Sequence, residues 1–219
     1  MSSRDDILGR VRAGLHRNAS NAAVAREEML AALTNRSQGP KPGIDAEPKA
    51  LLERFRLKSE QQSSTVDIVA QESDVPAAVA RYLAAMNLPK SAVAWPSLAR
   101  LDWAAAGLQV EGRGARDADL VGITGCFCAV AETGTLMVCS SPDTPATVSL
   151  LPETHIAVVH ASRILAYMED AWAVARKELG ALPRAVNFIS GPSRTGDIEQ
   201  TIVLGAHGPY RVHLVIVSD

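Results

Sequence analysis

The sequence is poor in the residues that mark several large classes of protein. It has three cysteines, Cys126, Cys128 and Cys139, an odd number without the spacing of a disulfide framework, which favours free thiols in a reducing compartment. Its 22 basic and 24 acidic side chains nearly cancel, so no broad positive field is available for non-specific binding of nucleic acid. Five histidines are too few and too scattered for a metal-rich module.

Long apolar runs and the common cofactor motifs are also missing. No stretch approaches the roughly 20 apolar residues of a membrane span. The N-terminus has no apolar run of signal-peptide length, and Asp5 and Asp6 are unusual in an import peptide. There is no G-x-x-x-x-G-K loop, no G-x-G-x-x-G after an expected strand and no H-E-x-x-H. These absences predict a cytoplasmic protein.

The N-terminal region predicts helices outside the main domain. Residues 1–36 contain two helical patterns with narrow apolar stripes, and residues 37–49 form a linker in which five of thirteen positions are Pro or Gly. Short helices of this kind are rarely stable alone in water, so we expect them to dock on the body of the chain or on a partner. The stripes consist of Ile7, Leu8, Val11 and Leu15 in the first helix, and Ala25, Met29 and Leu33 in the second.

From residue 50 short apolar strands alternate with helices. The strand patterns are "STVDIVA", "SAVAWP", "DLVGIT", "HIAVVH", "RAVNFIS" and "RVHLVIV", and the helix patterns include "DVPAAVARYLAAMN" and "ILAYMEDAWAVARKEL". The alternation predicts an α/β domain over residues 50–219, with a largely parallel sheet covered on both faces. Residues 97–118 show no regular pattern.

The stretch "SGPSRTGDIEQTIVLGAHGP", residues 190–209, contains the densest group of polar and turn-forming residues. Its composition predicts a short helix over residues 195–204, capped by Ser193 or Thr195 and ended by Gly205. Acids in the first turn suit the helix dipole. Capping explains most of this stretch and leaves Arg194 and His207 without a role.

An anion-binding site is the alternative interpretation of the same stretch. Ser193, Arg194, Thr195 and Gly196 would surround the unpaired N–H groups of a helix start, and His207 is a further candidate ligand. The acids in the first turn count against an anion there. Because a helix of ten residues is about 15 Å long, His207 is expected at the end opposite Ser193.

The stretch "AVAETGTLMV" offers a second candidate, Glu132. The simpler interpretation is a tight turn between two strands, with Gly134 at positive φ, or a strand edge that exposes Glu132 to solvent. The alternative is a carboxylate nucleophile or base held at a turn, as covalent acyl transfer needs. Without a second catalytic group at a known distance, the turn is preferred.

Cys126 and Cys128 could share one face of a strand, which is one requirement of a metal site. No other cysteine or histidine cluster lies near them in the sequence, and small apolar thiols are common in buried strands. Structural cysteines are therefore the preferred interpretation, and no metal site is predicted.

Four segments in a fixed order carry a resemblance to a known family. "AETGT", then "SLLPETHIAVV", then "SGPSRTGDIE" and finally "GAHGP" resemble the lactate utilisation protein C family, the small LUD-domain proteins. The similarity extends from about Ala50 to the C-terminus, and the pairing of the last two segments is specific. The amphipathic N-terminal helix and the proline-rich linker are also similar to members of that family.

The resemblance implies a fold like that of the sugar-phosphate isomerase and CoA-transferase superfamily, a three-layer α/β arrangement. It also implies a role in oxidising L-lactate to pyruvate, together with two other proteins that carry iron–sulfur clusters. This sequence lacks the cysteine-rich segments of the cluster-bearing relatives, so the resemblance implies no cofactor in this chain. Cys126 and Cys128 lie outside the family pattern.

Two hypotheses follow. The first is a non-redox subunit of a lactate-oxidising system, which binds iron–sulfur partner proteins and a small anionic ligand near Ser193, Arg194 and Thr195. The second is a stand-alone transferase or isomerase-like enzyme on a phosphorylated or CoA-linked small molecule, with Glu132 as nucleophile or base and Arg194 holding the anion. The motifs favour the first, and the sequence leaves open whether the chain catalyses a reaction alone.

Overall fold

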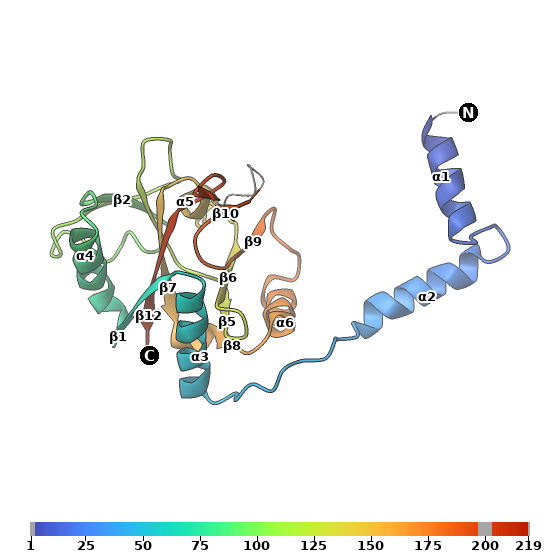
Figure 1. Cartoon of the computed structure of the whole chain (residues 1–219), viewed down its shortest axis with the longest axis horizontal. Coiled ribbons are helices and arrows are strands. Elements are labelled where there is room, and N and C mark those ends of the chain that lie inside the picture. Colours follow the sequence, from blue (N-terminus) through green and yellow to red (C-terminus); the bar gives the residue numbers. More distant parts are fainter. Residues whose placement is uncertain (1–2, 197–202, 219) are drawn as a thin grey trace. The chain divides into compact units, whose positions relative to one another are not determined.

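The N-terminal unit, Met1–Pro42, contains two helices and is compact by itself. We describe a computed structural model of the chain, which covers residues 3–196 and 203–218. Helices α1 (Ser3–Gly14) and α2 (Ala22–Asn35) form where the sequence predicts them (Figure 1). Neither helix buries a side chain within this unit.

The second unit, Gly43–Asp219, is built on a parallel sheet (Figure 1). Within the described residues the sheet has six strands, and every pair of neighbours is parallel. This confirms the α/β class and the largely parallel sheet. In spatial order the strands are β1 (Thr65–Val69), β12 (Arg211–Val217), β7 (Thr154–His160), β4 (Val121–Thr124), β2 (Ser91–Ala94) and β3 (Gln109–Gly112).

The central strands of this sheet, β12, β7, β4 and β2, are largely buried, which explains their continuous apolar runs. On one face the sheet packs against α4 (Val75–Ala85), an alanine-rich helix with a proline in its first turn. On the other face it packs against α3 (Pro48–Gln61), whose Phe55 is fully buried. Burying a phenylalanine contributes roughly 1.5–3 kcal/mol, so Phe55 is a main anchor of α3.

A second, smaller sheet lies beyond this face and was not predicted. In spatial order its strands are β8 (Ile164–Leu165), β5 (Cys128–Val130), β6 (Thr135–Cys139) and β9 (Val186–Ile189). Strands β5, β6 and β9 are antiparallel neighbours, whereas β5 and β8 are parallel. Helix α6 (Met168–Leu179) packs on its outer face through Ala171 and Ala175. The strand "RAVNFIS" therefore forms, half-buried in the smaller sheet.

The prediction of a helix over residues 195–204 is wrong for the residues at both ends of that range. β10 (Arg194–Thr195) and β11 (Val203–Leu204) pair antiparallel, and residues 197–202 lie outside the described residues. The β-branched side chains of Thr195 and Val203 favour this extended pairing. The last short elements are η1 (Glu72–Asp74), α5 (Thr147–Leu150) and η2 (Ala161–Arg163). Among the described helices, none has the length and apolar content to cross a membrane.

Two histidines are buried in the parallel sheet. His155 on β7 is fully buried, and its Nε2 lies 2.8 Å from Thr124 Oγ1. His213 on β12 stacks on Tyr82, with ring centroids 3.9 Å apart, and its Nδ1 lies 2.9 Å from Thr65 Oγ1. Burial disfavours the charged imidazolium and lowers the pKa of each ring from 6.5 to about 4. Both histidines are therefore neutral at pH 7.

His155 should make folding stability sensitive to mild acid. Between pH 6.5 and pH 4 the unfolded chain binds a proton at this ring and the folded chain does not, so the free energy of unfolding falls as the pH falls. From pH 7 to pH 4.5 the loss should be about 2 kcal/mol. In urea titrations at these two pH values, the loss in His155→Gln should be about 2 kcal/mol smaller than in the wild type, because His213 still contributes its own loss, and the exposed-site control His16→Gln should match the wild type. Equal pH dependence of the wild type and His155→Gln would contradict the assignment.

Candidate functional site

The motif segments that are far apart in the sequence lie together in the fold. "ETGT" forms the turn of the β5–β6 hairpin, "SGPSRT" follows β9, and "GAHGP" precedes β12. Strand β6 pairs with β9. The backbone of Ser193 joins the other two segments, because its N–H donates to Pro209 O at 2.8 Å and its carbonyl accepts from Gly205 N–H at 2.9 Å.

A chain of hydroxyl groups connects the "ETGT" turn to the end of β9. Thr133 Oγ1 lies 2.7 Å from Thr135 Oγ1, which lies 2.7 Å from Ser190 Oγ. Thr135 is buried, so its hydroxyl group needs these partners to offset its loss of water. The chain fixes the turn against the loop that begins at Gly191.

Two glycines let these turns touch the C-terminal end of α3. Gly134 has φ +67° and Gly191 has φ +73°, a region that other residues rarely adopt. A Cβ at Gly134 would lie 2.5 Å from Ser59 N, and a Cβ at Gly191 would overlap the carbonyl oxygen of Gln62. Glycine is therefore required at both positions by conformation and by space.

Arg194 reinforces the same contact. Its Nη2 donates to Gln62 O at 3.1 Å and also to Ser63 Oγ, so the guanidinium group holds the end of α3. The local sequence indicates no structural role for Arg194, because both partners lie more than a hundred residues earlier in the chain. Binding of an anion by Arg194 stays a prediction.

A cavity of about 290 Å³, which we call the motif cavity, lies where "SGPSRT" and "GAHGP" meet. Ser193, Arg194 and His207 contribute its polar lining, and Leu150 and Phe188 are among its apolar residues. Ser193 and His207 thus face one cavity, which corrects the expectation that they lie at opposite ends of a helix. The antiparallel β10–β11 pair brings the chain back toward Ser193.

The predicted anion site loses one of its premises. No helix begins at Thr195, which lies in β10, so the N–H groups of a helix start are not available there. Thr195 and Gly196 do not line the cavity. An anion at this place would depend on the side chains of Ser193, Arg194 and His207.

Glu132 occupies the hairpin turn and stands apart from this cavity. The turn with Gly134 at positive φ is confirmed. Glu132 is half-buried, and its N–H donates to Ala166 O at 3.0 Å. It is not among the residues that line the cavity with Arg194 and His207. The structure therefore does not bring the predicted carboxylate and the predicted anion ligands together.

Cys128 is buried in the smaller sheet, and Cys126 and Cys139 near it are half-buried. Cys128 is fully buried against α6, and burial raises the pKa of the Cys126 and Cys128 thiols to about 12. Such thiols stay protonated at neutral pH and are poor nucleophiles and metal ligands. Within residues 3–196 and 203–218, no three His, Cys, Asp or Glu side chains are grouped as a metal site would need.

The fold and the clustered motifs define a class of α/β domain in which a parallel sheet packs on a small mixed sheet. A crystal structure of a DUF162 family protein from Deinococcus radiodurans has this fold, with a TM-score of 0.60 and 24% identity, over 80% of this chain and 100% of that one. A family model for the LUD domain matches residues 52–217. The chain therefore belongs to the LUD domain family.

Curated relatives share part of this domain. "Lactate utilization protein C" of Bacillus subtilis (strain 168) is 41% identical over 102 residues, which is 45% of this chain and 42% of that protein. The protein of the same name from Shouchella clausii is 42% identical over 101 residues, 45% of this chain and 44% of that protein. The matched segment thus spans less than half of the length of these relatives.

The glycine contacts with α3 can be tested by three alanine variants. Gly107 has φ +73° but open space around its Cα, so Gly107→Ala should lower the free energy of unfolding by only about 1 kcal/mol. Gly191→Ala and Gly134→Ala should each cost at least about 3 kcal/mol, because the α3 backbone must also move. Chemical denaturation of the three variants measures the difference. Equal losses at Gly107 and Gly191 would show that the contact with α3 is unimportant.

Proposed function

We propose that this chain takes part in L-lactate utilisation as a non-redox subunit, working with iron–sulfur proteins that oxidise lactate to pyruvate. Membership of the LUD family and the relatives called lactate utilization protein C support the proposal. The observation that carries it is the meeting of "SGPSRT" and "GAHGP" around one cavity, with Arg194 bonded to the end of α3. We place the clusters in the partner proteins, no cofactor in this chain, and the system in the cytoplasm.

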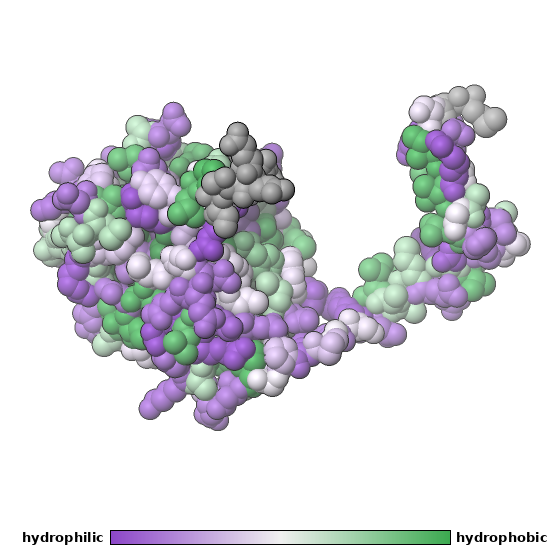
Figure 2. Space-filling model, in the orientation of Figure 1, coloured by the Kyte–Doolittle hydropathy of each residue, from purple (hydrophilic) through white to green (hydrophobic). Residues whose placement is uncertain are grey.

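The surface around the cavity has features of a protein contact. Leu150, Leu151, Gly205 and His207 line a shallow pocket beside it. Leu150, Leu151 and Leu204 are exposed, and we call this group the motif surface (Figure 2 shows one face of the molecule coloured by hydropathy). Single exposed leucines are ordinary, but several leucines beside one polar cavity favour an interaction site.

Within this proposal the cavity would accept a small anion. Arg194 supplies the positive charge, and Ser193 and His207 supply hydrogen-bond donors. The stand-alone transferase or isomerase has less support, since Glu132 does not share the cavity with these residues. One Nη of Arg194 also donates a hydrogen bond to Gln62 O at the end of α3.

The proposal predicts a physical complex. The tagged full-length chain, purified anaerobically from its own cells grown on L-lactate, should bring down iron-rich proteins, because a subunit without a redox centre must act through those that have one. Removing the chain from the extract should lower lactate-dependent dye reduction. A chain that comes down alone and iron-free, with no effect on dye reduction, would refute the proposed function.

The motif surface can be tested with a matched pair of variants. Leu151 is 56% exposed on this surface, and Leu182 is 57% exposed in the loop after α6. Leu151→Asp should reduce recovery of the iron-rich partners by at least about tenfold, because a charge would be buried in the interface. Leu182→Asp should leave recovery unchanged. Thermal unfolding confirms that both variants fold, and equal recovery with both would remove the motif surface from the interface.

A further inference from the structure

The carboxyl edge of the parallel sheet contains a topological switch point. From β2 the chain passes to β3 on one side, and then to β4 on the other side of β2. From β4 it continues away from β2, to β7 and β12. Open α/β sheets bind ligands outside the carboxyl ends of two neighbouring strands whose chain connections run to opposite sides of the sheet. In this chain those ends are followed by Trp95, after β2, and by Gly125 and Cys126, after β4.

Two adjoining cavities lie at this switch point. The larger has a volume of about 420 Å³ and the smaller about 240 Å³, and both are lined by Trp95, Cys126 and Thr144. His160, at the carboxyl end of β7, lines the smaller one. The larger volume lies in the range of small-molecule sites. The motif cavity, by contrast, is lined by Val212 at the amino end of β12, so the two places are distinct.

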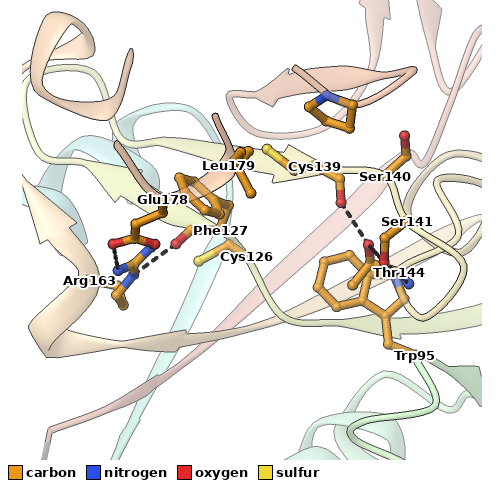
Figure 3. Close-up of a pocket in the computed structure, with 11 residues that line it drawn as sticks. Trp95, Cys126, Phe127, Cys139, Ser140, Ser141, Thr144, Arg163, Glu178 and Leu179 are labelled. Carbon is orange, nitrogen blue, oxygen red and sulfur yellow. Dashed lines mark hydrogen bonds and ion pairs between the residues drawn. The ribbon is translucent and has the colours of Figure 1, made fainter. Parts of the chain in front are cut away.

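The walls of the larger cavity are mostly apolar and aromatic (Figure 3). The Trp95 and Phe127 side chains lie on opposite sides of it. Gly125 lets the Trp95 ring lie close to the backbone, since a Cβ there would be 3.3 Å from Cζ3, and the indole N–H donates to Pro145 O at 3.3 Å. The indole ring is therefore fixed in place. Aromatic walls of this kind favour a flat ring as ligand.

The charges at this cavity cancel one another. Arg163 forms a two-pronged ion pair with Glu178, with N–O distances of 2.9 and 3.0 Å, and its Nε donates to Phe127 O at 2.9 Å (Figure 3). Three of the five guanidinium N–H groups are thus used, and the Glu178 carboxylate offsets the positive charge. Burial keeps the Cys126 thiol protonated by raising its pKa to about 12. A neutral ligand suits such a site better than a charged one.

Hydroxyl groups at one side of the cavity can orient a ligand. Ser140 Oγ accepts from the Ala185 N–H at 2.9 Å, which leaves its proton for an acceptor on the ligand. Thr144 Oγ1 donates to Cys139 O at 2.8 Å and so closes the turn between Cys139 and Thr144. We propose that the larger cavity, beyond the carboxyl ends of β2 and β4, is a binding site for a neutral, planar aromatic ring that carries a hydrogen-bond acceptor. We call this cavity the cleft. The proposal does not depend on the role in lactate utilisation.

Three probes of similar size test the site on the full-length chain. Benzamide is neutral and aromatic, benzoate carries a negative charge, and cyclohexanecarboxamide is neutral but not flat. Measured by ligand-observed NMR titration, benzamide should bind with a Kd on the order of millimolar. The other two should bind at least about fivefold more weakly. Absence of benzamide binding, or tighter binding of benzoate, would overturn the proposal.

Variants locate the binding. Leu179 lines the larger cavity and Leu182 does not, so Leu179→Trp should fill it and weaken benzamide binding at least about tenfold, while Leu182→Trp should stay within about twofold. Phe127→Leu keeps an apolar wall but removes a ring, and should weaken binding about threefold even if Leu179→Trp folds poorly. Unchanged binding in Leu179→Trp and Phe127→Leu would place the probe elsewhere. Failure of the pull-down would leave this result untouched.

Discussion

The contact between the end of α3 and the two glycine turns is the constraint on which the rest of the domain depends. Phe55 anchors α3 on the parallel sheet, and Gly134 and Gly191 bring turns of the smaller sheet against the last turn of that helix. Any side chain at either glycine would separate the two layers by the width of at least a methyl group. This contact fixes the positions of the smaller sheet, the motif cavity and the β10–β11 pair.

Arg194 shows how one residue can serve both structure and site. Its bonds to Gln62 and Ser63 hold the loop on α3, and its place in β10 sets the partner strand that leads to His207. The motif that resembles a capped helix in sequence thus anchors the loop on α3 and also lines the motif cavity. The His207 side chain can act at the cavity only if that anchor holds it in position.

The central strands could be predicted from the sequence because β2, β4, β7 and β12 are largely buried and are therefore apolar along their length. β3 could not be, since Gln109 and Glu111 leave it at an exposed edge without a pattern. The smaller sheet depends on pairing between "ETGTLMV" and "RAVNFIS", which no local signal contains. The helix expected over residues 195–204 failed for the same reason, because Arg194 pairs with Leu204 and with the distant end of α3.

The β5–β6 hairpin joins the two candidate sites of the domain. Its turn, with Thr133 and Thr135, belongs to the motif cavity region, and its open end, with Phe127 and Cys139, lines the cleft at the switch point. Strands rise about 3.3 Å per residue, so this hairpin spans about 15 Å. Its antiparallel ladder and its burial between α3 and α6 make it a stiff element. The hairpin therefore ties the position of the cleft to that of the motif cavity.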